Sequence, residues 1–270
     1  MSAPIRVLAT KPMSARRNIA VTAALAELHR AGQIPDTVRF SHHRRAVLLG
    51  RDDSFAAAYK VKSSLAGRLE IARRTSGRGT VYVSPGMLAW SVIAERYRFG
   101  AHLAEIGERI CAGVAAGLAR FGLPARFRPR DDVEIDGRSV CSASGAIDGS
   151  TVVFEGVVLI ELDASELEAM TRLLGGVRSH ADQPNAAAGV TTISQWLGRV
   201  PSDSEITDLL VAGLSHSWRR PLAPDPLTAA EVRLASRLFN EGIGRPKLAC
   251  PTTDMRRGER RAVVERAPLS

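Results

Sequence analysis

Apolar positions along this chain follow two spacings. In some stretches they recur every third or fourth residue, which predicts helices; in others they alternate with polar residues or run continuously, which predicts strands. Helices are expected over residues 14–31, 54–65, 100–121, 164–174, 190–198, 203–218 and 228–241. Strands are expected over residues 5–9, 37–40, 46–49, 80–83 and 87–94. Ser14, Ser202 and Thr228 stand where helix N-caps are expected.

The segment 125–162 has the pattern of a β-meander. A short strand over 125–127 is followed by an alternating run that ends at Asp136-Gly137, a dipeptide that favours tight hairpin turns. A second turn is predicted at 147–149, and a long apolar strand follows over 151–162. Antiparallel hairpins in the middle of a chain of strands and helices favour the α+β class over a doubly wound parallel sheet.

The pattern changes after residue 163, and this change sets the predicted domain organisation. Residues 1–175 are expected to form the core of the domain. Residues 176–189 are small, polar and irregular, so they predict a mobile connection. Residues 190–248 predict helices that pack on the core. Residues 249–270 are rich in Arg and Pro with little to bury, which predicts a disordered tail.

Neither the histidines nor the cysteines have the spacing of a metal site. His42 and His43 lie in a basic segment, 42–45, between two predicted strands, so an exposed hairpin turn is the expected structure. The three cysteines are far apart and odd in number, which fits neither a disulfide framework nor a zinc site. No chemistry follows from the histidine segment, whereas one of the cysteines, Cys141, lies beside other candidate residues.

The charge of the chain restricts its partners. The 270 residues carry a net charge of +9, almost all of it from arginine. A basic surface favours acidic partners such as nucleotides, acidic proteins or nucleic acid. Nucleic acid is the least expected of these, because aromatic residues make up only 5% and are not interleaved with arginine. No apolar run approaches the ~18 residues of a membrane span, and the N-terminus lacks a signal peptide's apolar core, so a cytoplasmic location is expected.

The stretch 73–82 is the strongest candidate for a binding loop. Arg73 and Arg74 precede a turn of small residues that contains Gly77 and Gly79, and a β-prone run follows. Glycines let backbone N–H groups approach an anion closely, and arginines present forked donors that match carboxylate or phosphate. The loop leads into a strand and not a helix, so it is not a dinucleotide-binding fingerprint.

Several segments, in order, resemble the lipoate–protein ligase and octanoyltransferase family, which shares its catalytic fold with biotin–protein ligase. The loop at 73–82 resembles that family's R-R-x-[ST]-G-G-G-A-V loop, and 130–138 resembles R-N-D-I-x-x-x-G-R-K. The further similar segments are 13–20, 37–51, 155–160 (H-G-T-L-L in the family), 197–199 and 227–231. The resemblance spans about residues 5–245 and implies a mixed sheet flanked by helices, with a small C-terminal helical segment.

The resemblance also implies a reaction. Lipoate or octanoate and ATP would give an acyl-adenylate, and the acyl group would pass to a lysine of a small acidic lipoyl domain. By position, eight residues would bind the acyl substrate or the adenylate: Arg73, Arg74, Ser76, Gly77, Gly79, Thr80, Arg138 and Gly156. Asp132 would hold Mg²⁺.

One departure from the family leaves three hypotheses open. Ser139 occupies the position of the family's catalytic lysine, and a neutral serine cannot replace an ammonium group electrostatically. In the first hypothesis Arg78 takes over the lysine's role and the chain is a ligase. In the second, Cys141 forms a thioester and the chain is an octanoyltransferase. In the third, the chain has lost catalysis and acts as a binding or regulatory partner.

Overall fold

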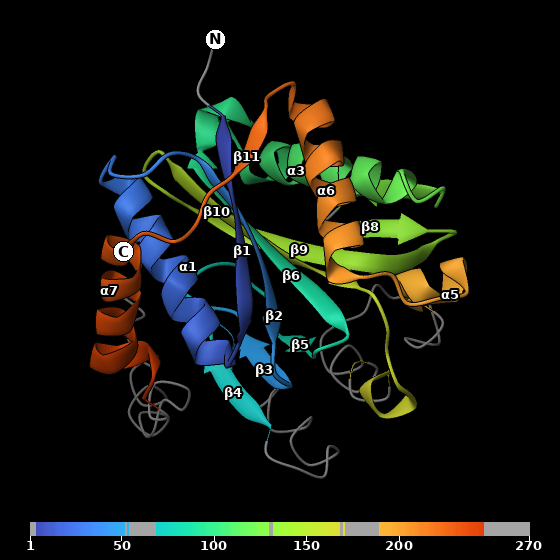
Figure 1. Ribbon diagram of the computed structural model, residues 1–270, viewed down its shortest axis with the longest axis horizontal. Coiled ribbons are helices and arrows are strands. Elements are labelled where there is room, and N and C mark those ends of the chain that lie inside the picture. The colour runs from blue at the N-terminus through green and yellow to red at the C-terminus, as the bar shows by residue number, and fades with distance from the viewer. Residues whose placement is uncertain are drawn as a thin grey trace, which may run out of the picture.

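Two β-sheets form the framework of the fold (Figure 1). The computed structural model describes residues 4–51, 53, 69–129, 132–167, 170 and 189–245. The larger sheet has eight strands in the order β11 (Leu222–Pro224), β1 (Ile5–Met13), β2 (Thr37–His43), β6 (Met87–Glu95), β10 (Thr151–Leu159), β9 (Arg138–Asp148), β8 (Asp132–Ile135) and β7 (Ala125–Arg128). The smaller has three, in the order β4 (Glu70–Arg73), β3 (Ala46–Leu49) and β5 (Val81–Val83).

Three of the helices begin where the sequence predicts. Ser14, Ser202 and Thr228 cap α1 (Ala15–Arg30), α6 (Asp203–Trp218) and α7 (Ala229–Leu238), each accepting a bond from a backbone N–H of the first turn. Further helical segments are a 3₁₀ turn (Arg96–Arg98), α3 (Leu103–Ala119), residues 164–167, α5 (Ile193–Leu197) and a π-helical turn (Phe239–Ile243). No helix in these described ranges is both long and apolar enough to span a bilayer.

Helices cover both faces of the large sheet. Side chains of neighbouring strand residues point to opposite faces, and the core divides accordingly. Val7 and Val92 pack with α3 and α6, whereas Leu8 and Ile93 pack with α1 and α7. In Figure 1, α7 runs beside α1, and α6 lies across α3. The C-terminal helices therefore complete the core on each face.

The predicted meander is confirmed. Strands β7, β8, β9 and β10 are antiparallel neighbours in chain order. Asp136 and Gly137 have φ values of 51° and 74°, so both central turn residues are left-handed, as the tight hairpin turn requires. The meander forms one half of the large sheet.

Other expectations differ from the structure. The basic segment at 42–45 is not an exposed hairpin turn, because β2 continues through His43, which is buried, and β3 belongs to the other sheet. Burial lowers the pKa of His43 to about 3, helped by the charges of Arg39 and His42. Strands β4 and β11 were not predicted. The predicted helix over 54–65, the tail at 249–270 and most of the segment 164–189 lie outside the described residues.

A buried carboxylate, Asp36, ties the end of α1 to the large sheet. It accepts hydrogen bonds from Arg220 (2.9 Å), from the Glu95 backbone (3.0 Å) and from His29 (3.1 Å), with Arg98 also at 3.1 Å. Burial alone would raise the pKa of Asp36, but these partners outweigh it and lower the pKa from 3.8 to about 2. The charged form therefore stabilises the fold.

Replacing Asp36 with Asn is expected to lower the free energy of unfolding at pH 7 by about 2–4 kcal/mol, because a buried network loses its charge. A lowered folded-state pKa contributes stability above the unfolded pKa, and this contribution is lost as pH falls through the folded one. The difference between wild type and variant should therefore shrink from pH 4 towards pH 2 in urea titrations. Asp148→Asn, which removes an exposed pair with Arg30, should change stability by less than about 0.5 kcal/mol. An equal loss in both variants would contradict the account.

Candidate functional site

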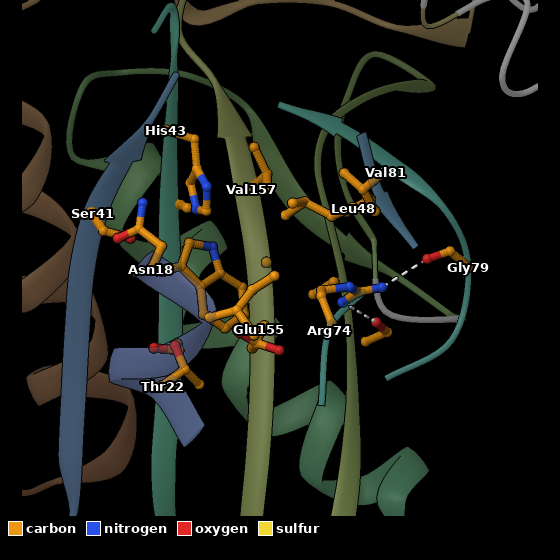
Figure 2. A pocket seen from close by; sticks show the side chains of 18 of the residues that line it. Asn18, Thr22, Ser41, His43, Leu48, Arg74, Gly79, Val81, Glu155 and Val157 are labelled. Atoms are coloured by element: carbon orange, nitrogen blue, oxygen red, sulfur yellow. Dashed lines mark hydrogen bonds between the residues drawn. The ribbon is translucent and has the colours of Figure 1, made fainter. Parts of the chain in front are cut away.

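A cavity of about 330 Å³ lies between the large sheet, the N-terminal half of α1 and the 74–81 loop. Figure 2 shows Asn18 and Thr22 of α1 on one side, Glu155 at the floor, and Arg74 and Gly79 on the other side. Apolar side chains line most of it: Ile19, Leu48, Val81, Ala89, Trp90, Ala143 and Val157. The size and lining suit a small ligand with a long apolar part.

Gly156 keeps the floor of the cavity closely packed. A Cβ atom at this position would lie 2.3 Å from the Trp90 ring, closer than any real contact. Gly156 also lines the cavity, and its binding of a substrate stays a prediction. A larger residue here would force the indole ring to move, so packing requires the glycine.

The two arginines that begin the loop donate hydrogen bonds to other atoms of the protein. Arg73 donates to the carbonyls of Gly50, Arg51 and Asp53 at 2.8–3.1 Å. Arg74 is buried and donates to the carbonyls of Arg78 (3.0 Å) and Gly79 (2.7 Å). Arg74 also donates to the Ser144 hydroxyl at 3.2 Å. Both guanidinium groups thus shape the loop, and direct ligand binding by them stays a prediction.

Backbone conformation and close packing explain why glycines occur in and beside the loop. Gly77 and Gly79 have φ values of 70° and 80°, which side-chain-bearing residues rarely adopt. Gly50 lets the loop approach β3, since a Cβ there would lie 2.8 Å from the Gly79 nitrogen. Asp53, which the sequence analysis missed, accepts from the Gly79 backbone (3.4 Å) and from Thr80 Oγ1 (2.9 Å). The loop is thereby held against the smaller sheet.

Arg78 is the exposed cation of this loop. It lines the cavity, and its carbonyl is fixed by Arg74. Within the described ranges its guanidinium makes no hydrogen bond or ion pair. Ser76, by contrast, is buried and donates to the Glu155 carboxylate. A cation beside a glycine loop is suited to bind a carboxylate or a phosphate.

The structure does not bring Ser139 or Arg138 to the cavity. The register between β8 and β9 shifts by one residue at Val140, which is a β-bulge. The backbone of Ser139 pairs with the 190–191 segment, and its carbonyl accepts from Thr191 N at 2.9 Å. Arg138 lies 5.6 Å over the Trp196 ring. Neither side chain is among those that line the cavity.

Cys141 lies in the core on the α3 face of the sheet. It is fully buried, as is the adjacent Val140, because the bulge interrupts regular alternation. Burial raises the pKa of the Cys141 thiol to about 12. The thiolate is the nucleophilic form of cysteine, so this environment disfavours a thioester step.

Cys141→Ala is accordingly expected to leave acyl transfer within about twofold of wild type, since no bond to the substrate would be lost. Alkylation of the native protein with iodoacetamide at pH 8 should leave Cys141 unmodified in peptide mass spectra, while alkylation in urea should modify it. Loss of transfer in Cys141→Ala without loss of stability would instead support the thioester hypothesis.

Asp132 lines the cavity, but its carboxylate already accepts from Arg128 at 2.6 Å. No group of three or more potential metal-ligating side chains occurs in the part of the chain that the structure describes. One carboxylate suits Mg²⁺ only when phosphate and water supply the remaining ligands. The Mg²⁺ role of Asp132 therefore stays a prediction tied to a bound nucleotide.

Sequence reasoning missed the charged residues of the cavity floor. Arg39 is 2% exposed, and Glu155 lies on the adjoining part of the same face. Both interrupt apolar strand sequences at positions that face inward. Buried charges are costly unless they are paired or bind something, so a charged residue inside an apolar strand was the available signal.

Comparison with known proteins agrees with this fold. Octanoyltransferase LipM of Symbiobacterium thermophilum is 25% identical, over 93% of this chain and 98% of its own. A solved lipoate-protein ligase A bound with ATP superposes with a TM-score of 0.73 at 21% identity, over 92% of this chain and 98% of that one.

A bipartite lipoate protein ligase of Thermoplasma acidophilum, solved in a study of that ligase and its E2 lipoyl domain, superposes with a TM-score of 0.74 at 20% identity, over 92% of this chain and 96% of that one. These structural likenesses show the fold: a mixed sheet flanked by helices. The model of the lipoyl protein ligase A/B catalytic domain matches residues 14–215. That match covers most of the chain, which therefore belongs to the lipoyl protein ligase A/B catalytic domain family.

Proposed function

We propose that this protein binds a carboxylic acid of the lipoate or octanoate type in the cavity, activates it with ATP and transfers the acyl group to a lysine of a lipoyl domain. The observation that carries the proposal is the apolar cavity walled on one side by the glycine loop, with the cation of Arg78 beside it. An apolar slot next to an anion-binding loop suits a ligand with an apolar chain and an acidic head.

The chain's own residues would act by binding and orientation. Positive-φ glycines at 77 and 79 let the loop backbone approach the carboxylate and the α-phosphate. Arg78 stabilises negative charge as a carboxylate oxygen attacks the α-phosphorus and pyrophosphate leaves. In the second step the acceptor lysine amine attacks the acyl carbonyl and AMP leaves. Mg²⁺ would accompany the nucleotide, with Asp132 as its protein ligand.

The proposed partner is a lipoyl-domain protein. The lipoate protein ligase of Thermoplasma acidophilum was solved in a study that includes its E2 lipoyl domain, and this chain shares its fold. A net charge of +9 favours an acidic acceptor. Burial of Cys141 favours the ATP-dependent route over the thioester route.

Incubation of the protein with octanoate or lipoate, ATP, Mg²⁺ and a lipoyl domain tests the proposal. Intact-mass spectrometry should detect an acylated lipoyl domain only when ATP is present. Modification from an acyl-carrier thioester without ATP would support an octanoyltransferase. Binding of the lipoyl domain with no modification under either condition would support the non-catalytic hypothesis.

A further inference from the structure

We propose that Glu155 is the proton acceptor of the transfer step: its carboxylate binds the amine of the acceptor lysine beside the acyl carbonyl and takes up the proton that the amine releases. The inference rests on the proposed function, because the acyl-adenylate is the product of the first step. It goes further by assigning the second step to a residue that the first step does not use.

Glu155 lies at the end of the cavity that the glycine loop walls. Its Oε2 accepts a hydrogen bond from the hydroxyl of Ser76, a residue of that loop. Glu155 also lies opposite Ser144 on the neighbouring strand, and a Cβ at Gly77 would lie 2.6 Å from the Ser144 hydroxyl. Figure 2 shows the Glu155 side chain at the floor of the cavity. An acyl carbonyl held by the glycine loop would therefore lie within reach of this carboxylate.

The second carboxylate oxygen of Glu155, Oε1, is open to the cavity. It accepts no hydrogen bond from the residues that the structure describes, and it is not one of the fully buried polar atoms that lack a partner. The residue as a whole is partly exposed and lines the cavity. Both oxygens of a carboxylate can accept hydrogen bonds. The bond from Ser76 therefore fixes one oxygen and leaves the other for a group that enters the cavity.

A negative charge at this end of the cavity favours the second step over the first. Glu155 would repel the carboxylate of the free acid, but two cations lie close enough to offset this repulsion. Burial lowers the pKa of Arg39 and of Arg74, and the charge of Glu155 raises both against this effect. In the adenylate the acyl carbonyl is uncharged, and the group that must approach it is a lysine amine, which is a cation in water. A carboxylate attracts this cation and accepts its hydrogen bond.

Two other side chains that line the cavity could in principle take up a proton, and both are less suited to do so. Burial lowers the pKa of His43 to about 3, so its ring binds a proton weakly. His43 also lies four residues beyond Arg39 on β2, or about 13 Å along the strand from the cross-strand row that contains Glu155. Asp132 already accepts a hydrogen bond from Arg128 at 2.6 Å. Glu155 is thus the best placed proton acceptor among the described residues of the cavity.

The transfer step requires no further reactant. The acceptor amine, after losing one proton to solvent, attacks the acyl carbon and forms the C–N bond. Its nitrogen becomes cationic, and a proton moves from it to Oε1 of Glu155. The bond between the acyl carbon and the phosphate oxygen breaks, AMP leaves with the electron pair, and Glu155 passes the proton to solvent. A positioned base typically accelerates such a step by about 10²- to 10⁴-fold.

Transfer from octanoyl-AMP to a lipoyl domain tests this assignment on the full-length protein, because supplying the adenylate bypasses the first step. Glu155→Gln keeps the shape of the side chain and an acceptor for Ser76, but it cannot take up a proton. Single-turnover transfer by this variant is expected to fall by about 10²-fold or more. Acid-dependent exchange of pyrophosphate into ATP should stay within about threefold of wild type. Transfer at the wild-type rate, or equal losses of transfer and exchange, would overturn the assignment.

Ser76→Ala is the matched control, because it removes the contact with the loop and keeps the carboxylate. It should not lower transfer selectively, and a selective loss as large as that in Glu155→Gln would overturn the assignment. Glu155→Ala with added formate gives a second comparison that does not depend on the glutamine variant. Formate can occupy the space of the lost carboxylate and should raise transfer but not exchange, whereas an unchanged transfer rate would contradict proton uptake by Glu155.

The two proposals can fail separately in these measurements. Transfer from octanoyl-AMP that depends on Glu155, in wild-type protein that shows no acid-dependent exchange, would refute activation with ATP and leave this inference intact. Acid-dependent exchange together with transfer that is independent of Glu155 would refute this inference alone.

Discussion

Replacing Arg78 with alanine is expected to lower the rate of acyl-adenylate formation by about 10²- to 10³-fold, with little change in stability. The Arg78 side chain is exposed at the cavity wall, and its guanidinium has no partner within the described residues, so its loss disturbs no packing. Its cation would stabilise charge that develops on the carboxylate and the α-phosphate. Acid-dependent exchange of labelled pyrophosphate into ATP measures this step directly.

Two matched variants separate the role of Arg78 from the net charge. Arg78→Lys keeps a cation on the loop and should retain activity within about tenfold of wild type. Arg120→Ala removes the same charge from the exposed end of α3 and should leave exchange unchanged. A similar loss in Arg78→Ala and Arg120→Ala would mean that long-range charge, and not a local contact, is responsible. Full activity of Arg78→Ala would refute its proposed role.

Replacing Arg74 with methionine should abolish acid binding and lower the free energy of unfolding by about 2–4 kcal/mol. Arg74 is buried and fixes the carbonyls of Arg78 and Gly79, so its loss leaves two loop acceptors without their donor. It also leaves the negative charge of Glu155 less compensated. Urea unfolding and calorimetry with octanoate give the two readouts.

Arg74→Lys is the matched control for this variant. Lysine restores the charge but cannot donate to both carbonyls and to Ser144 from one rigid fork. Stability should therefore recover in part, while acid binding should not. Normal binding in Arg74→Met would show that the loop holds its shape without this side chain.

The elements marked by local chemistry could be predicted from the sequence. Caps and tight turns are made by residues that are neighbours in the sequence. The starts of three helices could therefore be predicted from Ser14, Ser202 and Thr228, and one hairpin from Asp136-Gly137. Sheet membership is not local. The close spacing of β2 and β3 suggested a hairpin, yet the strands lie in different sheets, and β11 has only three residues, one of them proline.

The sequence predicted the loop that walls the cavity, but it did not predict the contacts that the side chains of the loop make. The glycine loop could be identified from the sequence because left-handed backbone conformations and close contacts between backbone segments require glycine at particular positions. The bonds of Arg73 and Arg74 to loop carbonyls were not predictable, since a guanidinium serves a protein acceptor as well as a ligand. The bulge at Val140 likewise changes the sheet faces to which Ser139 and Cys141 point. No residue in the sequence there predicts a bulge.

Serine occupies the family's lysine position in this chain, and we propose that the chain nevertheless activates a carboxylic acid with ATP. The most direct measurement is exchange of labelled pyrophosphate into ATP by the wild-type protein, with and without octanoate or lipoate. We predict exchange that requires the acid and Mg²⁺ and that falls by about 10²-fold or more in Arg78→Ala. Absence of acid-dependent exchange from wild-type protein that binds either acid would refute ATP-dependent activation by this chain.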